Sequence, residues 1–316
     1  MTGGGSVSVV VASYGCAGTL RELVTQVAEV VGTRLAEIVI VDDRSPDDSW
    51  SITKELAGGA HNVRAVRLSR NFGQHAAITA GIACASGDVI VLIDCDLQDS
   101  PSEIPRLIGA IEEGADVVIA QRIGSYDTRT RRALANRYAR TLGKLTPMRV
   151  DSSAGTFSAI NRKVADAFLS LGDLDRHYLH LLDWLGFSWV LVPVDRRGRD
   201  VGHSAYSIRK RVGHALSGVA FYGRSILRWL VAAGGVMLLL GVLAAITLVT
   251  LRFTIGLASG WTSLFIAVVV LGGLNLAAIG VVGLYVGRVY EQSAGRPIYV
   301  IDEDTGPISE TSERRR

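Results

Sequence analysis

Cysteine is scarce in this chain, with 3 in 316 residues. Cys16, Cys84 and Cys95 are odd in number and show no C-x-x-C spacing, which argues against a disulfide framework and against a zinc site. The sequence therefore predicts reduced thiols. A strong excess of charge is also missing, because a net charge of +3 is too small to indicate a nucleic-acid partner. Residues 1–5 lack a basic region, so we expect no cleavable signal and a first domain that stays in the cytoplasm.

Apolar residues are abundant and concentrated near the C-terminus. Hydrophobic residues make up 48% of the chain, and the mean hydropathy of +0.30 is high for an ordinary soluble protein. Residues 229–251 and 261–285 carry no charged side chain, and each run exceeds the roughly 20 residues that span a bilayer. The sequence therefore predicts two transmembrane helices. Glycines within them allow close helix contact and self-association into a homo-oligomer.

The charges around these runs predict their orientation. The connecting loop, residues 252–260, carries one arginine, whereas basic residues are frequent in residues 208–228 and 288–316. This bias predicts a hairpin with both termini in the cytoplasm. Residues 208–228 read as a basic amphipathic helix in the headgroup layer. Residues 288–316 read as a cytoplasmic tail that is disordered after Val300.

Residues 1–207 have the pattern of an α/β domain, in which short apolar runs alternate with helical segments. The predicted strands are residues 7–13, 37–43, 63–69, 89–94, 116–122 and 187–196. The predicted helices are residues 19–31, 49–56, 75–84 and 102–113. Such alternation indicates a largely parallel sheet with helices on both faces. Polar residues follow each strand, at the edge where open α/β sheets bind ligands.

The clearest candidate for chemistry is the pair Asp94 and Asp96, which follows the apolar run at residues 89–93. Side chains two residues apart on an extended segment share a face. Mg²⁺ usually takes one or two protein carboxylates and completes its shell with phosphates and water, which makes a diphosphate the natural third partner. The alternative is an acidic loop that merely closes a strand.

Three motifs occur in a characteristic order and spacing: Val41–Ser45, Leu68–Gly73 and Asp94–Pro101. Together they resemble the catalytic domain of family-2 glycosyltransferases, and within that family the polyprenyl-phosphate glycosyltransferases. That group contains dolichyl-phosphate mannose synthase and the bacterial undecaprenyl-phosphate sugar transferases. The resemblance extends from about Val7 to about Val300 and implies a GT-A-type, Rossmann-like domain.

The resemblance also implies a donor site. Asp96, with help from Gln98, would hold Mg²⁺ or Mn²⁺ on the diphosphate of a nucleotide sugar, while Asp43 and Asp94 would bond its base and ribose. The nucleotide-sugar site would comprise Ala12, Tyr14, Asp43, Arg70, Asp94, Cys95, Arg199, Ser204 and Tyr206. From the residues alone, Asp43 could instead belong to the cap of the helix that starts at Ser49. His75 could lie near the diphosphate or be exposed at a helix start.

Arginines would bind the acceptor. Residues 121–149 are rich in arginine, whose planar fork makes two charge-assisted hydrogen bonds to a phosphate at once. By resemblance this segment binds the phosphate of a lipid acceptor, through Arg122, Arg129, Arg131 and Arg132. Arg122 would join Asp94 and Asp96 as a catalytic residue. A solvated basic helix at the membrane surface is the alternative.

Three positions depart from the pattern of that group. Ala12 stands where proline is usual, Thr156 replaces an acid that orients the acceptor or serves as base, and Ala205 replaces a lysine. A phosphate acceptor is already ionised near neutral pH, so positioning and charge stabilisation could carry the reaction. Trp184 and Phe187 are predicted to be core residues rather than ligand-binding ones.

Together these features predict a multi-pass protein of the inner membrane, an inverting glycosyltransferase. It would move a sugar from a nucleotide sugar to a polyprenyl phosphate at the cytoplasmic leaflet. One alternative is a transferase that acts on a lipid-linked or protein-bound glycan, and another is a non-catalytic nucleotide-sugar-binding membrane protein. A processive polysaccharide synthase would carry Q-x-x-R-W, but Ser225 stands where the glutamine should precede Arg228 and Trp229.

Overall fold

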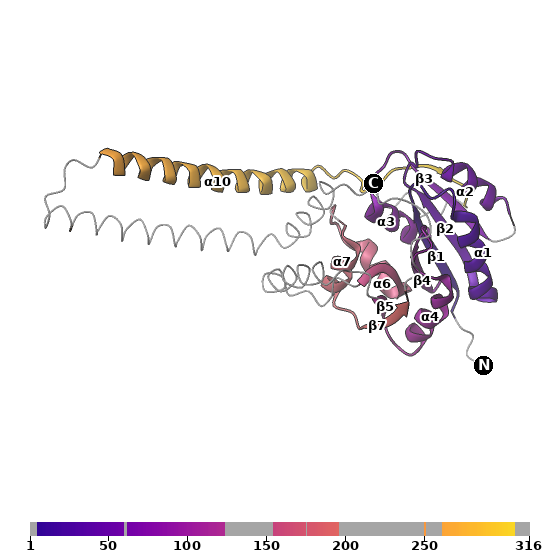
Figure 1. Cartoon of the computed structure of the whole chain (residues 1–316). Coiled ribbons are helices and arrows are strands. Elements are labelled where there is room, and N and C mark those ends of the chain that lie inside the picture. Colours follow the sequence, from indigo (N-terminus) through magenta and orange to yellow (C-terminus); the bar gives the residue numbers. More distant parts are fainter. Residues whose placement is uncertain are drawn as a thin grey trace. The chain divides into compact units, whose positions relative to one another are not determined.

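The computed structural model describes residues 5–59, 62–123, 154–174, 176–195, 250 and 261–306. The chain divides into two compact units. The first consists of Met1–Ser204 with Pro297–Arg316, and the second of Ala205–Arg296. The sheet and its covering helices belong to the first unit, and the helix α10 (Trp261–Ser293) belongs to the second (Figure 1).

An eight-stranded sheet forms the centre of the first unit, in the order β7-β5-β6-β4-β1-β2-β3-β8. Its strands are β1 Val7–Ser13, β2 Leu35–Asp42, β3 Val63–Leu68, β4 Val89–Asp94, β5 Val117–Ile123, β6 Ala154–Asn161, β7 Trp189–Asp195 and β8 Ile301–Asp304. β6 runs antiparallel to β4 and β5, β8 runs antiparallel to β3, and the other neighbours are parallel. The predicted mostly parallel α/β sheet is confirmed, although β6 and β8 were not predicted.

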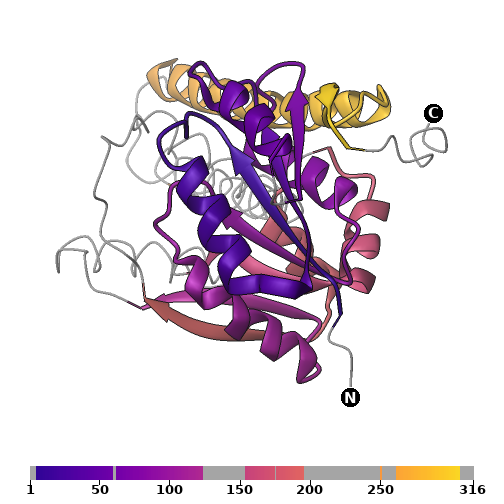
Figure 2. The same ribbon diagram turned by 90° about the vertical axis from the view of Figure 1, so that its right-hand side faces the viewer.

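Helices cover both faces of the sheet, as expected. They are α1 Leu20–Val31, α2 Ser49–Ala57, α3 Gln74–Cys84, α4 Ile104–Glu112, α6 Arg162–Ser170 and α7 Tyr178–Leu185, with short 3-10 turns η1 Gly32–Arg34 and η2 Pro101–Glu103. α1 and α4 lie on one face, and α3 and α6 on the other (Figures 1 and 2). α1 buries Leu20, Leu23, Val24, Val27 and Val31, the spacing of one apolar helix face.

α3 packs so closely on β1 and β2 that one position has no room for a side chain. A Cβ atom on Gly81 would come within 2.3 Å of Val10 Cγ1 and 3.3 Å of Val41 Cγ2. Gly81→Ala should therefore lower the free energy of unfolding by about 1–3 kcal/mol, measured by chemical denaturation. Gly109→Ala in α4 is the matched control, because a Cβ there meets nothing within 4 Å. Equal effects of the two variants would contradict the close approach of α3.

Residues 301–304 form a strand, so the prediction of disorder after Val300 is wrong for this segment, while residues 307–316 lie outside the described residues. Ile301–Asp304 pairs antiparallel with β3, and Thr305 N donates to Ala65 O at 3.0 Å. The segment is short and polar, and its few apolar residues suggested that it could not contribute to a core. It is held instead by main-chain pairing with an edge strand and by ion pairs, which hydrophobic patterning does not reveal.

The predicted membrane hairpin stays a prediction. α10 covers the second predicted span, residues 261–285. The first span, residues 229–251, lies outside the described residues apart from Thr250, as do residues 208–228. Within the part of the chain that the structure describes, no helix combines the length and apolar character needed to cross a membrane.

Candidate functional site

The candidate site lies where the carboxyl ends of the central parallel strands meet. From β1 the chain moves outward through β2 and β3, then returns to place β4 on the other side of β1. This reversal is the topological switch point at which open α/β sheets bind ligands. The register sets Ala12 beside Val41 on one side and beside Asp94 on the other. Ala12, Asp43 and Asp94 are therefore brought to one edge, as the sequence predicted.

Asp94 ends β4 and is fixed by two side chains from distant parts of the chain. Its Oδ1 atom accepts hydrogen bonds from Gln74 Nε2 at 2.9 Å and from Thr156 Oγ1 at 2.8 Å. Gln74 begins α3, and Thr156 lies on β6, which pairs with β4. Sequence reasoning missed both contacts. The sequence held one signal of the second contact: Thr156 places a hydroxyl where the resembled group carries an acid.

Asp96 offers the exposed carboxylate of the site. Its Oδ1 accepts from Gln98 N at 3.1 Å, and Leu97 between them has φ +57°, so the chain turns sharply after β4. The Gln98 side chain is buried. Among the described residues, no group of three or more His, Cys, Asp and Glu side chains is arranged to hold a metal ion. One exposed carboxylate suits a hard divalent ion that takes its remaining ligands from a diphosphate and water.

Asp43 is buried and holds a neighbouring loop. Its Oδ1 accepts from Phe72 N at 2.7 Å, and its Oδ2 accepts from Gly73 N at 2.8 Å. Burial raises the pKa of Asp43, and the two backbone hydrogen bonds partly oppose that rise. The cap of α2 is Asp48, so the alternative that Asp43 caps this helix is wrong. Asp43 instead ties the end of β2 to the start of α3.

Exposed side chains surround this edge. Tyr14 is 54% exposed directly after β1. Arg70 is also exposed, and its guanidinium carbon lies 4.0 Å from the centre of the Phe72 ring. Both residues were predicted to bind the donor, and Arg70 lies against the loop that Asp43 holds.

Cys16 and Cys95 form a disulfide, so the prediction of reduced thiols is wrong for this pair. Their Cα atoms are 6.1 Å apart although the two cysteines are 79 positions apart in sequence. The two cysteines follow neighbouring parallel strands, β1 and β4, and spacing in the sequence could not show that proximity. The bond joins the turn before α1 to the Asp94–Asp96 loop. Thr19 Oγ1 reinforces it by donating to Cys95 O at 2.6 Å.

Three histidines pack in a row beside the start of α3. The rings of His75 and His177 have centres 4.4 Å apart, and those of His177 and His180 are 4.0 Å apart. Tyr178 N also donates to His75 Nδ1 at 3.5 Å. The reading of His75 as simply exposed at a helix start is therefore wrong.

Several predicted site residues cannot be placed. Arg122 lies in β5, but its side chain is not among those described. The remaining predicted residues of the acceptor segment and the diphosphate loop lie outside the described residues: Arg129, Arg131, Arg132, Arg199, Ser204 and Tyr206. Their roles stay predictions.

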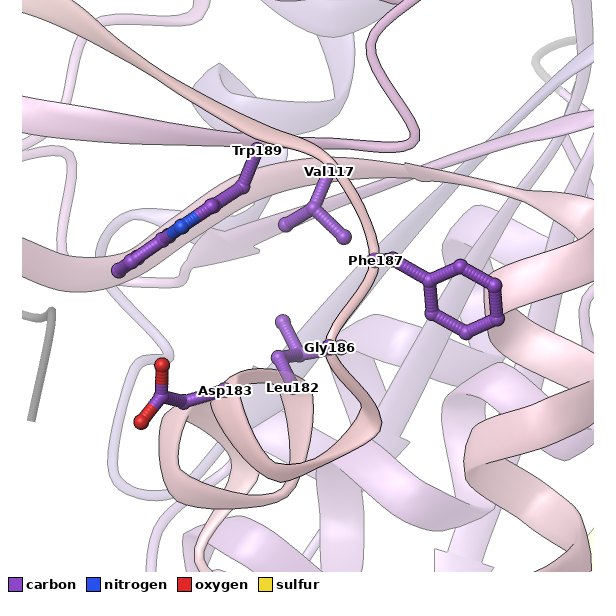
Figure 3. Close-up of a pocket in the computed structure, with 6 residues that line it drawn as sticks. All are labelled: Val117, Leu182, Asp183, Gly186, Phe187 and Trp189. Carbon is purple, nitrogen blue, oxygen red and sulfur yellow. The ribbon is translucent and has the colours of Figure 1, made fainter.

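A small pocket lies apart from the predicted donor residues, between α7 and the strands β5 and β7. Its lining residues are Val117, Leu182, Asp183, Gly186, Phe187 and Trp189 (Figure 3). Nearby Trp184 is 68% exposed, so its prediction as a core residue is wrong. Phe187 is half-buried, with Lys163 Nζ 4.9 Å from its ring centre. α7 thus turns Trp184 outward while its buried face packs on the sheet domain.

Comparison with known proteins gives consistent matches. A family model described as glycosyl transferase family 2 matches residues 8–169. An uncharacterized glycosyltransferase of Synechocystis sp. is 32% identical over 302 residues, covering 94% of this chain and 95% of that protein. An undecaprenyl-phosphate 4-deoxy-4-formamido-L-arabinose transferase of Enterobacter sp. is 33% identical over 320 residues, covering 98% of this chain and 97% of that protein. A structure of glucosyl-3-phosphoglycerate synthase from Mycobacterium tuberculosis with Mn²⁺ and uridine-diphosphate-glucose is 21% identical, covers 66% of this chain and 74% of that one, and has a TM-score of 0.44.

Proposed function

The chain belongs to glycosyl transferase family 2, and from that premise we propose that it transfers a sugar from a nucleotide sugar to a polyprenyl phosphate. It is a glycosyltransferase, and relatives matched over nearly their whole length include a transferase named for undecaprenyl phosphate. The observation that carries the proposal is the exposed Asp96 two residues beyond the fixed Asp94 at the switch point of the sheet.

The donor would bind along the carboxyl ends of β1, β2 and β4. Asp96, assisted by Gln98, would hold Mg²⁺ or Mn²⁺, which when bound stabilises the charge that develops on the leaving diphosphate. Tyr14 and Arg70 are exposed where they can contact the nucleotide. The bonds from Gln74 and Thr156 to Oδ1 hold the Asp94 carboxylate at the end of β4, where it would bond the ribose or base.

The acceptor needs no general base in this scheme. An oxygen of the ionised phosphate attacks the anomeric carbon, the bond from that carbon to the nucleoside diphosphate breaks, and the configuration inverts. Thr156 stands where the resembled group carries an acid, and its hydroxyl donates to Asp94 instead. Positioning and charge stabilisation therefore supply the catalysis. We assign acceptor binding to Arg122 and to the arginines at positions 129, 131 and 132.

We further propose that the chain is anchored in the inner membrane with both termini in the cytoplasm. Arginines are frequent on both sides of the two apolar runs, and the loop between them carries one. Along α10, large apolar side chains are exposed: Leu264, Val268, Leu271, Ile279, Val282, Val286 and Val289. A lipid environment would cover such side chains. The anchor would keep the catalytic domain at the leaflet where a lipid phosphate is presented.

Transfer of radiolabel to lipid tests the proposal. Membranes that contain the full chain would be incubated with polyprenyl phosphate and a panel of labelled nucleotide sugars, with and without EDTA. We expect a labelled, chloroform-extractable lipid from at least one donor, lost on addition of EDTA. Label that appears only on a water-soluble or protein-bound glycan would show a different acceptor. Binding of nucleotide with Mn²⁺ but no transfer from any donor would favour a non-catalytic protein.

Thr156→Val should lower kcat/KM for transfer by about 10- to 100-fold, because it removes a hydrogen bond to a charged group worth roughly 1.5–3 kcal/mol. Valine nearly matches threonine in shape, so β6 and its pairing should persist. Thr156→Ser keeps the hydroxyl and is the matched control, expected to stay within about threefold of the wild type. Steady-state kinetics with the donor found in the panel, beside a thermal melt, would check both. Equal activity of the valine variant and the wild type would contradict a role for this bond.

A further inference from the structure

The C-terminal strand β8 lies on the open edge of the sheet, next to the strand that leads into the donor loops. It pairs with β3 through the register Val66 to Asp304 and Arg67 to Glu303. At its start, Val300 O accepts a hydrogen bond from Ser69 N at 2.9 Å, one residue before Arg70. β8 therefore reaches the end of β3 from which the Arg70–Gly73 loop continues.

Charge complementarity adds to this pairing. The acidic side chains of β8 pair with basic side chains on β3, on α2 and in the turn after β2. Asp302 Oδ2 lies 2.6 Å from Arg44 Nη1, and Asp304 Oδ2 lies 2.7 Å from Arg64 Nη2. Glu303 lies within 3.5 Å of Arg67 Nη1 and 3.7 Å of Lys54 Nζ. The charges of β8 are thus complementary to those of this edge, in addition to the main-chain pairing.

Arg44 links β8 to the donor site. It follows Asp43 directly and has φ +58°, a left-handed conformation that is uncommon and unfavourable for a residue other than glycine. On its other side, Ser45 N donates to the buried Asp42 carboxylate at 3.2 Å, and Ser45 Oγ accepts from Gly15 N at 3.2 Å. The ion pair with Asp302 therefore holds the exposed side chain of a turn in which Asp42, Asp43 and Ser45 are buried.

We propose that Asp302 is a positioning residue for the donor site. Through Arg44 it fixes the Asp42–Ser45 turn, and β8 as a whole fixes the adjoining Arg70–Gly73 loop. A segment that follows the predicted membrane anchor in sequence thereby orders these loops from the β3 side of the sheet. The inference rests on the proposed function only in identifying these loops as part of the donor site.

Hydrogen–deuterium exchange of the full chain, which needs no substrate, tests whether Asp302 orders the two loops. The amides of Ser45, Phe72 and Gly73 report on the two loops, because they donate to the carboxylates of Asp42 and Asp43. In Asp302→Asn we expect these amides to exchange about three- to fivefold faster, the effect that an exposed ion pair can have. Amides of β1 and β4 should be unchanged. Asp302→Glu keeps the charge and should restore protection.

Asp304→Asn is the matched control, since it removes an ion pair of the same strand at the end remote from the donor loops. Faster loop exchange in Asp304→Asn equal to that in Asp302→Asn would mean that only strand pairing matters, and would overturn the assignment to Asp302. Unchanged exchange in Asp302→Asn would overturn it as well.

Steady-state kinetics test whether the ordered loops position the donor. Asp302→Asn should raise KM for the nucleotide-sugar donor about three- to fivefold while kcat stays within twofold, because donor positioning and not chemistry is altered. Loosened loops with an unchanged donor KM would overturn the link to the donor site. Should no donor be transferred by the wild type, the proposed function would fail, but the exchange experiment would still decide whether Asp302 orders the loops.

Discussion

Replacing Asp96 with alanine is expected to lower kcat/KM for sugar transfer by about a thousandfold while leaving the fold intact. Asp96 is exposed, and within the described residues its side chain accepts one hydrogen bond, from Gln98 N in the same turn. Little folding energy therefore depends on it. Its proposed partner is a divalent ion that stabilises the leaving diphosphate, a contribution of about 4 kcal/mol, which corresponds to three powers of ten in rate.

Asp166→Ala is the matched control for this variant. Asp166 is an exposed aspartate of α6 in the same unit, and its carboxylate lies 4.0 Å from Arg162 Nη1. Its replacement should leave both activity and thermal stability near those of the wild type. The measurement is initial rate against donor concentration at several Mn²⁺ concentrations, beside a thermal melt. An Asp96→Ala variant that retains more than a tenth of wild-type activity at saturating Mn²⁺ would show that metal binding does not depend on this carboxylate.

Removing the Cys16–Cys95 disulfide is expected to lower the free energy of unfolding by about 2–4 kcal/mol, and the melting temperature by roughly 4–16 °C. The bond closes a loop of 79 residues, and cross-linking such a long loop restricts the unfolded chain strongly. Cys16→Ser with Cys95→Ser, purified beside the wild type without reductant, would be compared by thermal melting. Adding dithiothreitol should lower the wild-type melting temperature toward that of the double variant.

Cys84 supplies the control for this experiment. It is the free cysteine of the described residues, and burial raises its pKa to about 11. Cys84 should therefore remain unmodified by iodoacetamide at pH 8 in the native protein, whereas reduction should expose Cys16 and Cys95 to the reagent. Rapid labelling of all three cysteines without reductant, or a double variant as stable as the wild type, would contradict a structural disulfide.

Much of the α/β domain could be predicted from sequence because its information is local. The short apolar runs that became β1 to β5 and the helical spacing of α1 and α4 follow from neighbouring residues. The strand edge that carries Asp43 and Asp94 could also be predicted, since parallel strands place their carboxyl ends together. β6 was missed because Ala154–Asn161 mixes small and polar residues and its burial depends on β4 and β5 beside it.

The sequence by itself determined the family, the alternation of strands and helices, and the carboxylate pair at the end of β4. Only the tertiary structure decided which distant groups meet there: Gln74 and Thr156 on Asp94, Cys16 on Cys95, and Asp302 on Arg44. The physical reason is that periodicity and turn chemistry depend on residues a few positions apart, whereas these contacts depend on strand order and register. Those are fixed only when the whole sheet assembles.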